Sequence, residues 1–480
     1  MKLSKLVKFI PYNEMKGVVE GVEVTGISTD SRTTKKGDIF VCYRGESYDS
    51  HAAADEAERA GAVALVCEYP LTNALPQIIV KDGRAQVARV ARAFYGFADS
   101  RLKLVGVTGT NGKTTTTHML ESIFSADGKK TGVIGTLGIR YGEKFVSPEL
   151  TTPDPVFLHS VFADMAADGV EYVFMEVSAH ALHFDKIAGL NFEVGIFTNC
   201  TQDHLDFFQD MKTYAAAKRK MFKDARCKYA VINSDDELGV ELMREVKNHF
   251  SYGLKNPADV FAVDINESID GTAFVLNLFD ELYEINLKIP ALHNVYNAMA
   301  AAACAKILGV RTPVIASGLK NLKTVEGRLE KVARFNGADI FVDFAHTPDG
   351  LEKSLQSLRK LCRGKLYCVF GCGGNRDSKK RPLMGEVAAK YSDFCIVTSD
   401  NPRFEEPFDI ISDIERGIKP TGKPYVTVSE RELATEYAVR LLEEGDILLV
   451  AGKGGEHYQE IMGIKHSYDD NTVIKKIIGD

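Results

Sequence analysis

Short apolar runs alternate with amphipathic stretches along the whole chain. Runs rich in β-branched residues predict strands at 39–42, 64–67, 104–108, 172–177, 194–198, 229–232, 340–343, 366–370, 394–398 and 446–451. Amphipathic stretches between these runs, for example 86–98 and 294–308, predict helices. This alternation favours an α/β protein in which helices cover parallel sheets.

Polar breaks divide the pattern into three blocks. A chain of 480 residues is too long for one ordinary core. The segment Asp99-Ser100-Arg101 interrupts the first strand–helix series, and a new series begins after Gly327-Arg328. We therefore expect domains at 1–99, 100–329 and 330–480.

Composition narrows the classes of protein. A hydrophobic content of 45% with 26% charged residues indicates a folded globular chain. The net charge of −7 argues against a nucleic-acid-binding protein, which would need a basic surface. Cys368 and Cys372 lack a companion pair or histidine cluster, so a structural zinc site is not expected. No apolar stretch has the length of a signal peptide core or a membrane span, so we expect a cytoplasmic protein with no membrane or nucleic-acid partner.

A glycine-rich segment follows the apolar run at 104–108. Glycines let backbone N–H groups turn toward an anion, a lysine reaches the outer phosphates, and a threonine hydroxyl can hold magnesium. The general phosphate-loop pattern places glycine where this chain has Val107, and a plain strand-to-helix turn would explain the glycines alone. Gly-Lys-Thr-Thr after a buried strand favours the nucleotide site. The expected ATP-binding residues are Gly109, Thr110, Asn111, Gly112, Lys113, Thr114 and Thr115.

This loop resembles the ATP loop of the Mur ligases, the amide-bond-forming enzymes of peptidoglycan precursor synthesis. Further segments resemble signatures of the members that add the third amino acid to UDP-N-acetylmuramoyl-L-alanyl-D-glutamate. They are 28–32 (STDSR), 151–153 (TTP), 176–180 (EVSAH), 201–206 (TQDHLD), 326–328 (EGR) and 344–348 (FAHTP). The resemblance implies a three-domain architecture with a UDP-substrate-binding domain, a P-loop-type central ATPase domain and a Rossmann-like C-terminal domain.

The resemblance also implies a reaction and its residues. ATP would phosphorylate the D-glutamate side-chain carboxylate, and an amine would then displace phosphate from the acyl phosphate. Such catalysis is mostly positioning and neutralisation of phosphate oxygens. The implied catalytic residues are Lys113, Lys218 as N6-carboxylysine, His204 and Arg328. The implied Mg²⁺ ligands are Thr114, Glu176, His204 and carbamylated Lys218. Asn294, Asn297, Arg328, Asp343 and His346 would complete the ATP site.

Taken singly, these residues have simpler interpretations. Glu176 could be a solvent-facing charge at a strand end, His204 an ordinary loop histidine and Lys218 a solvated helix lysine. Asn294 could cap the helix at 294–308. Arg328 could be a linker arginine without a ligand.

The expected UDP-substrate contacts are Ser31, Thr151, Thr152, Ser178 and Lys186. The chain departs from the familiar pattern at Lys186, where arginine is usual, and lysine keeps the charge but loses the bidentate fork.

Residues 400–403, Asp-Asn-Pro-Arg, resemble the specificity loop of members that add meso-diaminopimelate. The guanidinium of Arg403 with the amide of Asn401 can bind the second carboxylate of that amino acid. Lysine lacks this carboxylate and would leave a buried cation unpaired. The expected diaminopimelate contacts are Arg376, Asp400, Asn401, Pro402, Arg403, Gly452 and Glu456. A surface turn is the alternative, because Asn-Pro favours turns.

We therefore expect an ATP-dependent acid–amino-acid ligase that uses Mg²⁺ and acts as a monomer. The alternatives are a lysine-adding member, another Mur or folylpolyglutamate-type ligase, or a nucleotide switch that signals through a partner.

Overall fold

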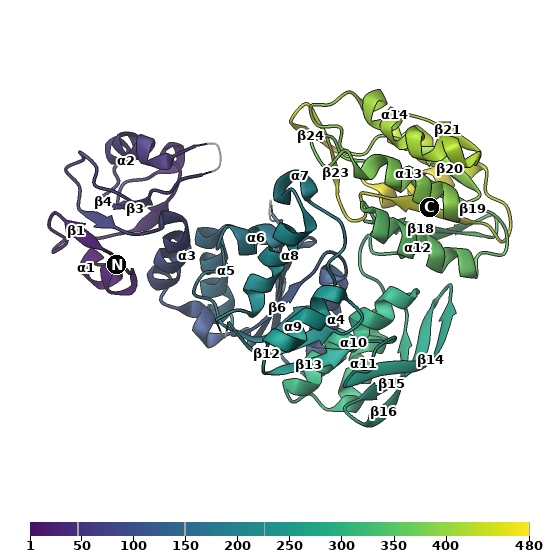
Figure 1. Ribbon diagram of the computed structural model, residues 1–480, viewed down its shortest axis with the longest axis horizontal. Helices are drawn as coiled ribbons and strands as arrows, with labels where there is room; N and C mark the ends of the chain where they lie inside the picture. Colours follow the sequence, from purple (N-terminus) through teal and green to yellow (C-terminus); the bar gives the residue numbers. More distant parts are fainter. Residues whose placement is uncertain (46–47, 148–149, 225, 480) are drawn as a thin grey trace. The chain divides into compact units, whose positions relative to one another are not determined.

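The computed structural model of the protein describes residues 1–45, 48–147, 150–224 and 226–479 (Figure 1). They group into two compact units. Unit 1 comprises Met1–Thr108, Lys129–Gly195 and Ala217–Tyr229, and unit 2 comprises Gly109–Gly128, Ile196–Ala216 and Ala230–Asp480. Both units contain strands and helices, which confirms the predicted α/β class.

Unit 1 begins with a five-stranded sheet covered on both faces. The third and fourth strands along the chain, at 38–41 and 64–67, are buried at every position, as expected when helices cover both sides. Leu3, Leu6 and Val90 pack on one face, whereas Ala54 and Ala57 pack on the other. In sheet order the strands are β1 (Glu14–Lys16), β5 (Gln77–Ile79), β4 (Ala64–Cys67), β3 (Asp38–Val41) and β2 (Gly26–Ser28), and only β1 is antiparallel to its neighbour. The helices are α1 (Leu3–Leu6), η1 (Val7–Phe9), η2 (Ser31–Thr33), η3 (Ser50–Ala53), α2 (Ala54–Ala60), α3 (Gly83–Phe94) and η4 (Ala98–Arg101).

The rest of unit 1 contains a second strand ladder. Its parallel strands are β6 (Lys103–Thr108), β10 (Tyr172–Glu176) and β7 (Thr131–Gly135), and the antiparallel strands β8 (Gly138–Tyr141) and β9 (Lys144–Val146) follow. Glu176 pairs in register with Val107 on β6. The helices of this part are α5 (Pro155–Ala167), α6 (Ala179–His183) and η5 (Lys220–Phe222). The sheet therefore delivers the carboxylate of Glu176 to the strand that leads into the glycine-rich loop.

Unit 2 contains this loop and a set of helices and antiparallel strands. The helices are α4 (Lys113–Ala126), α7 (Leu205–Phe208), α9 (Glu237–Glu245), α10 (Leu292–Ile307) and α11 (Thr312–Asn321). Strands β13 (His249–Tyr252), β14 (Val260–Ser268), β15 (Gly271–Leu278) and β16 (Glu281–Leu287) pair successively. The chain passes between the units within β11 (Phe192–Phe197), α8 (Met211–Arg219) and β12 (Cys227–Asn233).

The C-terminal part of unit 2 is a six-stranded sheet with helices on both faces (Figure 1). Phe341 and Phe370 pack with Leu355 and Ile414 on one face, whereas Val342 packs on the other face with the helices at 431–440 and 470–478. In sheet order the strands are β17 (Glu330–Phe335), β18 (Ala338–Asp343), β22 (Ile447–Ala451), β19 (Leu366–Phe370), β20 (Phe394–Val397) and β21 (Tyr425–Thr427). The helices are α12 (Pro348–Leu361), α13 (Lys380–Tyr391), α14 (Pro407–Ile418), η6 (Lys419–Thr421), α15 (Arg431–Arg440) and α16 (Asp470–Ile478), and β23 (Tyr458–Ile461) pairs with β24 (Ile464–Ser467) as a hairpin.

Every strand predicted from the sequence is present, with ends that differ by at most two residues. The expectation of parallel sheets alone was wrong, because β14, β15 and β16 are antiparallel, as are β8, β9 and β17 with their partners. The helix predicted at 86–98 ends at Phe94, because Gly96 and Phe97 adopt positive φ.

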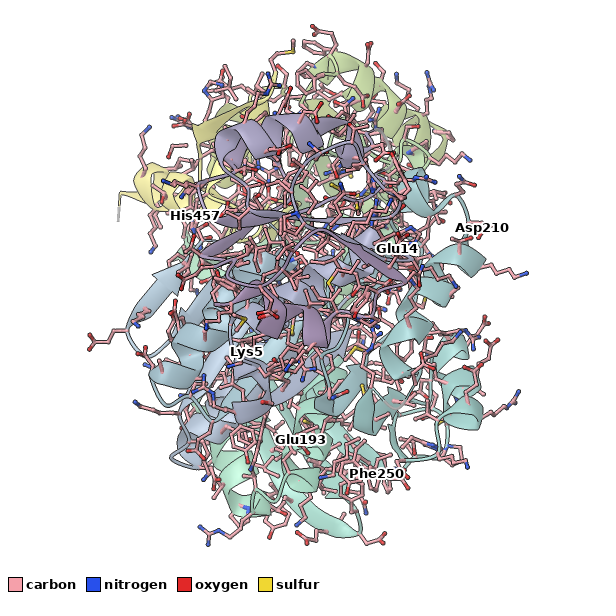
Figure 2. All side chains as sticks on the ribbon, turned by 90° about the vertical axis from the view of Figure 1, so that its left-hand side faces the viewer. Lys5, Glu14, Glu193, Asp210, Phe250 and His457 are labelled. Carbon is pink, nitrogen blue, oxygen red and sulfur yellow. The ribbon has the colours of Figure 1, made fainter. Side chains whose placement is uncertain are left out.

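Charged side chains such as Lys5, Glu14 and Asp210 lie on the surface (Figure 2). Among the described residues, no helix combines the length and apolar character that a membrane crossing requires. Cys368 and Cys372 are buried, and burial raises the pKa of both thiols.

Candidate active site

The glycine-rich loop follows β6 and ends at the start of α4. Gly109 and Gly112 adopt φ of 153° and 90°, which L side chains rarely adopt. A Cβ on Gly109 would lie 1.8 Å from the Thr198 hydroxyl oxygen, and one on Gly112 would lie 2.4 Å from the side-chain oxygen of Asn297. Both positions therefore require glycine, and the backbone is shaped as the sequence predicts for a phosphate-binding loop.

Lys113 and Thr114 begin α4 directly after the loop. The Lys113 ammonium donates to the carbonyl oxygens of Gly109 and Thr110, both at 2.8 Å. These carbonyls hold the cation at the loop, where an incoming phosphate can exchange for them. Arg328 Nη2 donates to the Thr114 hydroxyl at 2.9 Å, so this arginine, predicted from the sequence, reaches the loop.

A further contact at the loop was missed from the sequence. Asn111 Nδ2 donates to Asp349 Oδ2 at 2.8 Å, and the Thr201 hydroxyl donates to the same oxygen at 3.3 Å. Asp349 belongs to the first turn of α12, and no motif marked it. The contact fastens the tip of the loop to the helix that follows β18.

Asn294 and Asn297 face the loop from α10. Asn294 Nδ2 donates to the Pro290 carbonyl oxygen at 2.7 Å, and Asn297 Nδ2 donates to Asn294 Oδ1 at 3.1 Å. The alternative that Asn294 caps this helix was wrong, since the N-cap residue is Ala291 and Asn294 lies inside the first turn.

Asp343 and His346 follow the end of β18. The Asp343 carboxylate accepts hydrogen bonds from the backbone N–H groups of Leu329 and Ala345, at 2.5 Å and 3.0 Å. Asp343 thus fixes the segment that carries Arg328. His346 Nδ1 lies 2.8 Å from the Phe344 carbonyl oxygen, and burial together with the Lys380 charge lowers the pKa of His346. The neutral ring donates from Nδ1 and leaves Nε2 as an acceptor.

His204 occupies a strained backbone position. Its φ is 55°, which is uncommon outside glycine, and such residues cluster at functional sites. Asp203 Oδ2 lies 3.3 Å from His204 Nε2 and 3.9 Å from His346 Nε2. Burial would raise the pKa of Asp203, but the charges of His204, His346 and Lys380 lower it. The ionised Asp203 carboxylate therefore lies close to both imidazole rings.

In unit 1, Glu176 is 1% exposed, so the interpretation as a solvent-facing strand-end charge was wrong. Its Oε1 accepts from the Thr136 N–H at 2.9 Å, and its Oε2 accepts from the Thr136 hydroxyl at 3.2 Å. These two bonds fix the orientation of the Glu176 carboxylate.

Lys218 lies near the C-terminus of α8 and is also 1% exposed. The interpretation as a solvated helix lysine was therefore wrong. Burial disfavours the ammonium form of a lysine, and carbamylation needs the neutral amine.

The expected UDP-substrate residues also lie in unit 1. The Thr152 hydroxyl donates to the Glu176 carbonyl oxygen at 2.9 Å and accepts from the Ser178 N–H at 3.0 Å. The Thr151 and Thr136 hydroxyls are 3.1 Å apart, which places Thr151 beside the same carboxylate.

The remaining two expected substrate residues already have protein partners. Lys186 forms an ion pair with Asp154 at 2.7 Å, and Ser31 donates to Glu56 at 2.9 Å. A phosphate ligand would compete with Asp154 for Lys186.

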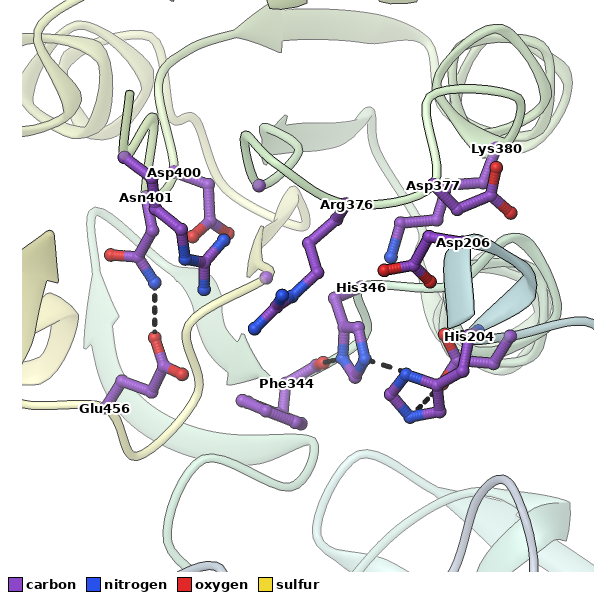
Figure 3. A pocket seen from close by; sticks show the side chains of 14 residues that line it. His204, Asp206, Phe344, His346, Arg376, Asp377, Lys380, Asp400, Asn401 and Glu456 are labelled. Carbon is purple, nitrogen blue, oxygen red and sulfur yellow. Dashed lines mark hydrogen bonds and ion pairs between the residues drawn. The ribbon is translucent and has the colours of Figure 1, made fainter. Parts of the chain in front are cut away.

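The other predicted residues line a pocket in unit 2 of about 170 Å³ (Figure 3). Arg376 projects toward its middle, with Asn401 and Glu456 on one side and His346 on the other. The lining residues are Asp203, His204, Asp206, Phe344, His346, Gly373, Arg376, Asp377, Lys380, Asp400, Asn401, Arg403, Gly452 and Glu456. The structure thus brings six of the seven expected diaminopimelate residues to one pocket, and the seventh, Pro402, lies in the same loop.

A buried polar network forms one wall. Asn401 Nδ2 donates to Glu456 Oε2 at 2.9 Å, and Asn401 Oδ1 accepts from the Lys453 ammonium at 2.9 Å. Burial and the Asp400 charge raise the pKa of Glu456. The Asn401 amide is therefore engaged within the protein, and the expectation that it binds a substrate carboxylate requires it to exchange partners.

Lys453 is 0% exposed and was missed from the sequence, although the glycine-rich run Gly452-Lys453-Gly454-Gly455 directly follows the strand predicted at 446–451. Gly452 has φ 114°, and a Cβ there would lie 2.6 Å from Asp400 Oδ2. The glycine lets the strand end approach the Asp400 carboxylate closely.

Arg403 lines the same pocket with a positive φ of 54°. Its Nη1 donates to the Gly374 carbonyl oxygen at 2.8 Å, and its Nε donates to Glu460 Oε2 at 3.1 Å. The sequence analysis expected that a lysine substrate would leave the Arg403 guanidinium unpaired. The structure changes this expectation, because Glu460 already pairs with Arg403.

The donors expected for Mg²⁺ are mostly hard oxygen atoms. The Thr114 hydroxyl and the Glu176 carboxylate suit Mg²⁺, which usually takes few protein ligands and completes its shell with water and phosphate oxygens. Among the described residues there is no group of three or more His, Cys, Asp or Glu side chains arranged as a metal site.

Comparison with known proteins agrees with this geometry. The family descriptions "Mur ligase family, catalytic domain", "Mur ligase middle domain" and "Mur ligase, glutamate ligase domain" match residues 23–95, 107–305 and 327–454. Two similar relatives bear the name UDP-N-acetylmuramoyl-L-alanyl-D-glutamate--2,6-diaminopimelate ligase. The one from Caldanaerobacter subterraneus subsp. tengcongensis is 40% identical over 100% of this chain and 99% of its own length. The one from Syntrophomonas wolfei subsp. wolfei is 41% identical over the same shares.

Solved structures show the same architecture. A structure of a protein with that same name superposes with a TM-score of 0.69 at 31% identity and covers 95% of each chain. MurF ligase from Thermotoga maritima in complex with ADP shares the fold, with a TM-score of 0.63 at 23% identity over 90% of this chain and 95% of that one. The predicted three-domain Mur ligase architecture is thereby confirmed, and the chain belongs to the Mur ligase family.

Proposed function

We propose that this chain is an ATP-dependent ligase that joins meso-2,6-diaminopimelate to the D-glutamate side-chain carboxylate of UDP-N-acetylmuramoyl-L-alanyl-D-glutamate. The observation that carries the proposal is the pocket in unit 2, where Arg376 and Arg403 lie beside the buried network of Asn401 and Glu456. Relatives about 40% identical along the whole chain bear the name of this activity.

The pocket has the chemistry that diaminopimelate requires. This amino acid carries an ammonium and a carboxylate at each end. Guanidinium groups bind carboxylates as bidentate forks, and Arg376 makes only one hydrogen bond within the described chain, from Nη1 to the Asn375 carbonyl oxygen at 3.3 Å. Arg403 keeps Nη2 available after its bonds to Gly374 and Glu460. Glu456 and Asp400 offer carboxylates to an ammonium.

The phosphate loop supports the ATP-dependent step. A carboxylate is a poor electrophile, so ATP supplies a phosphoryl group that turns the hydroxide-like leaving group into phosphate. The Lys113 ammonium would exchange its loop carbonyls for phosphate oxygens. Arg328, already at the Thr114 hydroxyl, adds a second cation beside the loop.

The residues that we propose for Mg²⁺ are Thr114, Glu176, His204 and Lys218 as its carbamate. Bound with ATP, Mg²⁺ would neutralise charge on the phosphate oxygens. Thr136 orients the Glu176 carboxylate, and Asp203 orients His204.

The other residues assigned from the sequence, in the ATP site and in the UDP-substrate site, belong to the same proposal, as do the domain boundaries at 99/100 and 329/330. In the UDP-substrate site, Thr152 and Ser178 hydrogen-bond to each other next to Glu176, which supports a common role for this segment.

One assay tests the function. ADP and phosphate release are measured with UDP-N-acetylmuramoyl-L-alanyl-D-glutamate, ATP and Mg²⁺ while diaminopimelate, lysine or ornithine is supplied as the amine. We expect release that depends on both the UDP substrate and diaminopimelate. Preference for lysine would reject the amino-acid assignment, and amine-independent ATP hydrolysis would reject the ligase.

A further inference from the structure

Lys380 is a mostly buried lysine at the N-terminus of helix α13. It lines the pocket together with Asp203, His346 and Asp377, and it is 7% exposed. Figure 3 shows its side chain extending from α13 into the pocket on the side of His346. Within the part of the chain that the structure describes, the Lys380 side chain forms no hydrogen bond and no ion pair. Most of the side chain is thus packed within the fold while its ammonium faces the pocket, where a ligand could bind it.

The next residue, Arg381, is a buried cation that has ion-pair partners within the protein. Arg381 is 3% exposed, and its guanidinium pairs with Glu405 at 2.8 Å and with Asp413 at 3.0 Å. The fold thus supplies two ion-paired carboxylates to Arg381, whereas Lys380 has the charge of Asp203 nearby but forms no ion pair with it among the described residues. This contrast indicates that the partner of Lys380 is a ligand.

The surroundings indicate an anionic ligand. Lys380 is the first residue of α13, where backbone N–H groups point out of the helix, and no side chain caps them. Arg376 projects into the same pocket. The acidic neighbour Asp203 pairs with His204 at 3.3 Å rather than with Lys380, and Asp377 Oδ1 accepts from the Lys379 N–H at 2.9 Å. A phosphoryl group would receive the Lys380 ammonium and the helix N-terminus together.

The position of Lys380 in the pocket indicates which phosphoryl group it would bind. The pocket has the proposed amino-acid contacts Asn401 and Glu456 on one side, and on the other side it has the proposed magnesium ligand His204 and the proposed ATP contact His346. A phosphoryl group on the D-glutamate carboxylate would lie between an amine and a nucleotide. Lys380 is on the nucleotide side of that line.

We propose that Lys380 is a catalytic residue that binds the phosphoryl oxygens of the acyl phosphate and of the departing phosphate. In the step it assists, the amine nitrogen forms the C–N bond, the C–O bond to phosphate breaks with its electron pair on phosphate, and the amine proton passes to water. The ammonium neutralises the charge that grows on phosphate as this bond breaks. This inference rests on the proposed ligase function.

The test compares Lys380→Met with Lys379→Met, which removes an adjacent, exposed lysine. We expect Lys380→Met to lower kcat by about 10²- to 10³-fold, as removal of one transition-state donor does, while the KM for diaminopimelate changes little. Its melting temperature should stay close to that of the wild type, because the Lys380 ammonium forms no hydrogen bond or ion pair within the described chain. Lys380→Arg should recover part of kcat. Wild-type kcat in Lys380→Met, or a loss matched by a large fall in melting temperature, would overturn the inference.

A binding measurement separates this inference from the proposed function. Inorganic phosphate should raise the melting temperature of the wild type and of Lys379→Met, and it should raise that of Lys380→Met much less. If the wild type lacks ligase activity but this difference persists, the anion site stands and the ligase assignment fails. If the ligase is active and phosphate stabilises Lys380→Met as it does the wild type, the role of Lys380 is rejected.

Discussion

Arg403 and Glu460 form an ion pair, with 3.1 Å between Nε and Oε2, at the edge of the amino-acid pocket. Their backbones are also joined, since the Arg403 N–H donates to the Glu460 carbonyl oxygen at 3.1 Å and the Met462 N–H donates to the Arg403 carbonyl oxygen at 2.7 Å. The hairpin of β23 and β24 therefore holds the loop at 400–403 in place. Arg403 can adopt its positive φ because these contacts fix it.

Replacing Arg403 tests the diaminopimelate assignment. Arg403→Ala should raise the KM for diaminopimelate by about tenfold to a hundredfold, because a charge-assisted hydrogen bond to the distal carboxylate is lost. The KM values for ATP and for the UDP substrate should stay within about twofold in steady-state assays. If the variant keeps the wild-type KM for diaminopimelate, the loop is only a turn.

The ion pair predicts a second effect on selectivity. In Arg403→Ala the Glu460 carboxylate loses its guanidinium and becomes available to an ammonium. Lysine, whose far end carries only an ammonium, should therefore become a better substrate than it is for the wild type. Adding Glu460→Gln to Arg403→Ala should remove that gain in kcat/KM for lysine. Equal use of lysine by the single and the double variant would contradict this role of Glu460.

Lys113→Ala should abolish turnover with little effect on the fold. Lys113 donates to the loop carbonyls of Gly109 and Thr110, and it neutralises phosphate oxygens in the proposed reaction. We expect kcat to fall by about 10²- to 10³-fold and the melting temperature to change by only a few degrees. Lys320→Ala, which removes an exposed lysine at the end of α11, is the control and should behave as the wild type. ATP turnover by Lys113→Ala at the wild-type rate would remove the loop from the mechanism.

The sequence predicts the α/β class and the parallel strands because buried runs of β-branched residues have a clear signature. It misses β14, β15 and β16 because these strands are buried on one face only. Along β15 alternate residues are buried, and many exposed positions of these strands carry polar and charged residues, so no continuous apolar run spans any of them. Motifs identify Glu176 and Lys218, and their burial at 1% exposure agrees with a special role. Motifs did not identify Lys453, Asp349 or Glu460, because partners distant along the chain define what each does.

His159 predicts a pH dependence of stability. It is 1% exposed on α5, its Nε2 has no hydrogen-bond partner, and burial together with the Arg92 charge lowers its pKa to about 3. Between pH 6.5 and 3 the unfolded chain binds a proton that the folded chain excludes, so His159 lowers stability by roughly 1.4 kcal/mol per pH unit as pH falls.

Replacement of His159 by leucine should flatten this slope. Relative to its difference from the wild type at pH 7.5, His159→Leu should gain about 2 kcal/mol of stability at pH 5, measured by denaturant unfolding at both pH values. Parallel stability curves for the two proteins would show that His159 titrates normally.

Lys218 provides the sharpest test of a modified residue. Lys218 is buried near the end of α8, and a carbamate would turn its side chain into an anion. Lys218→Ala should be inactive, and bicarbonate or short carboxylates should restore part of kcat by replacing the missing anion. Lys212→Ala, an exposed lysine on the same helix, should keep full activity with or without these anions. A crystal structure of the nucleotide complex with an unmodified Lys218 would contradict the carbamate, and rescue of Lys218→Ala by methylamine in place of a carboxylate would show that the site needs a cation.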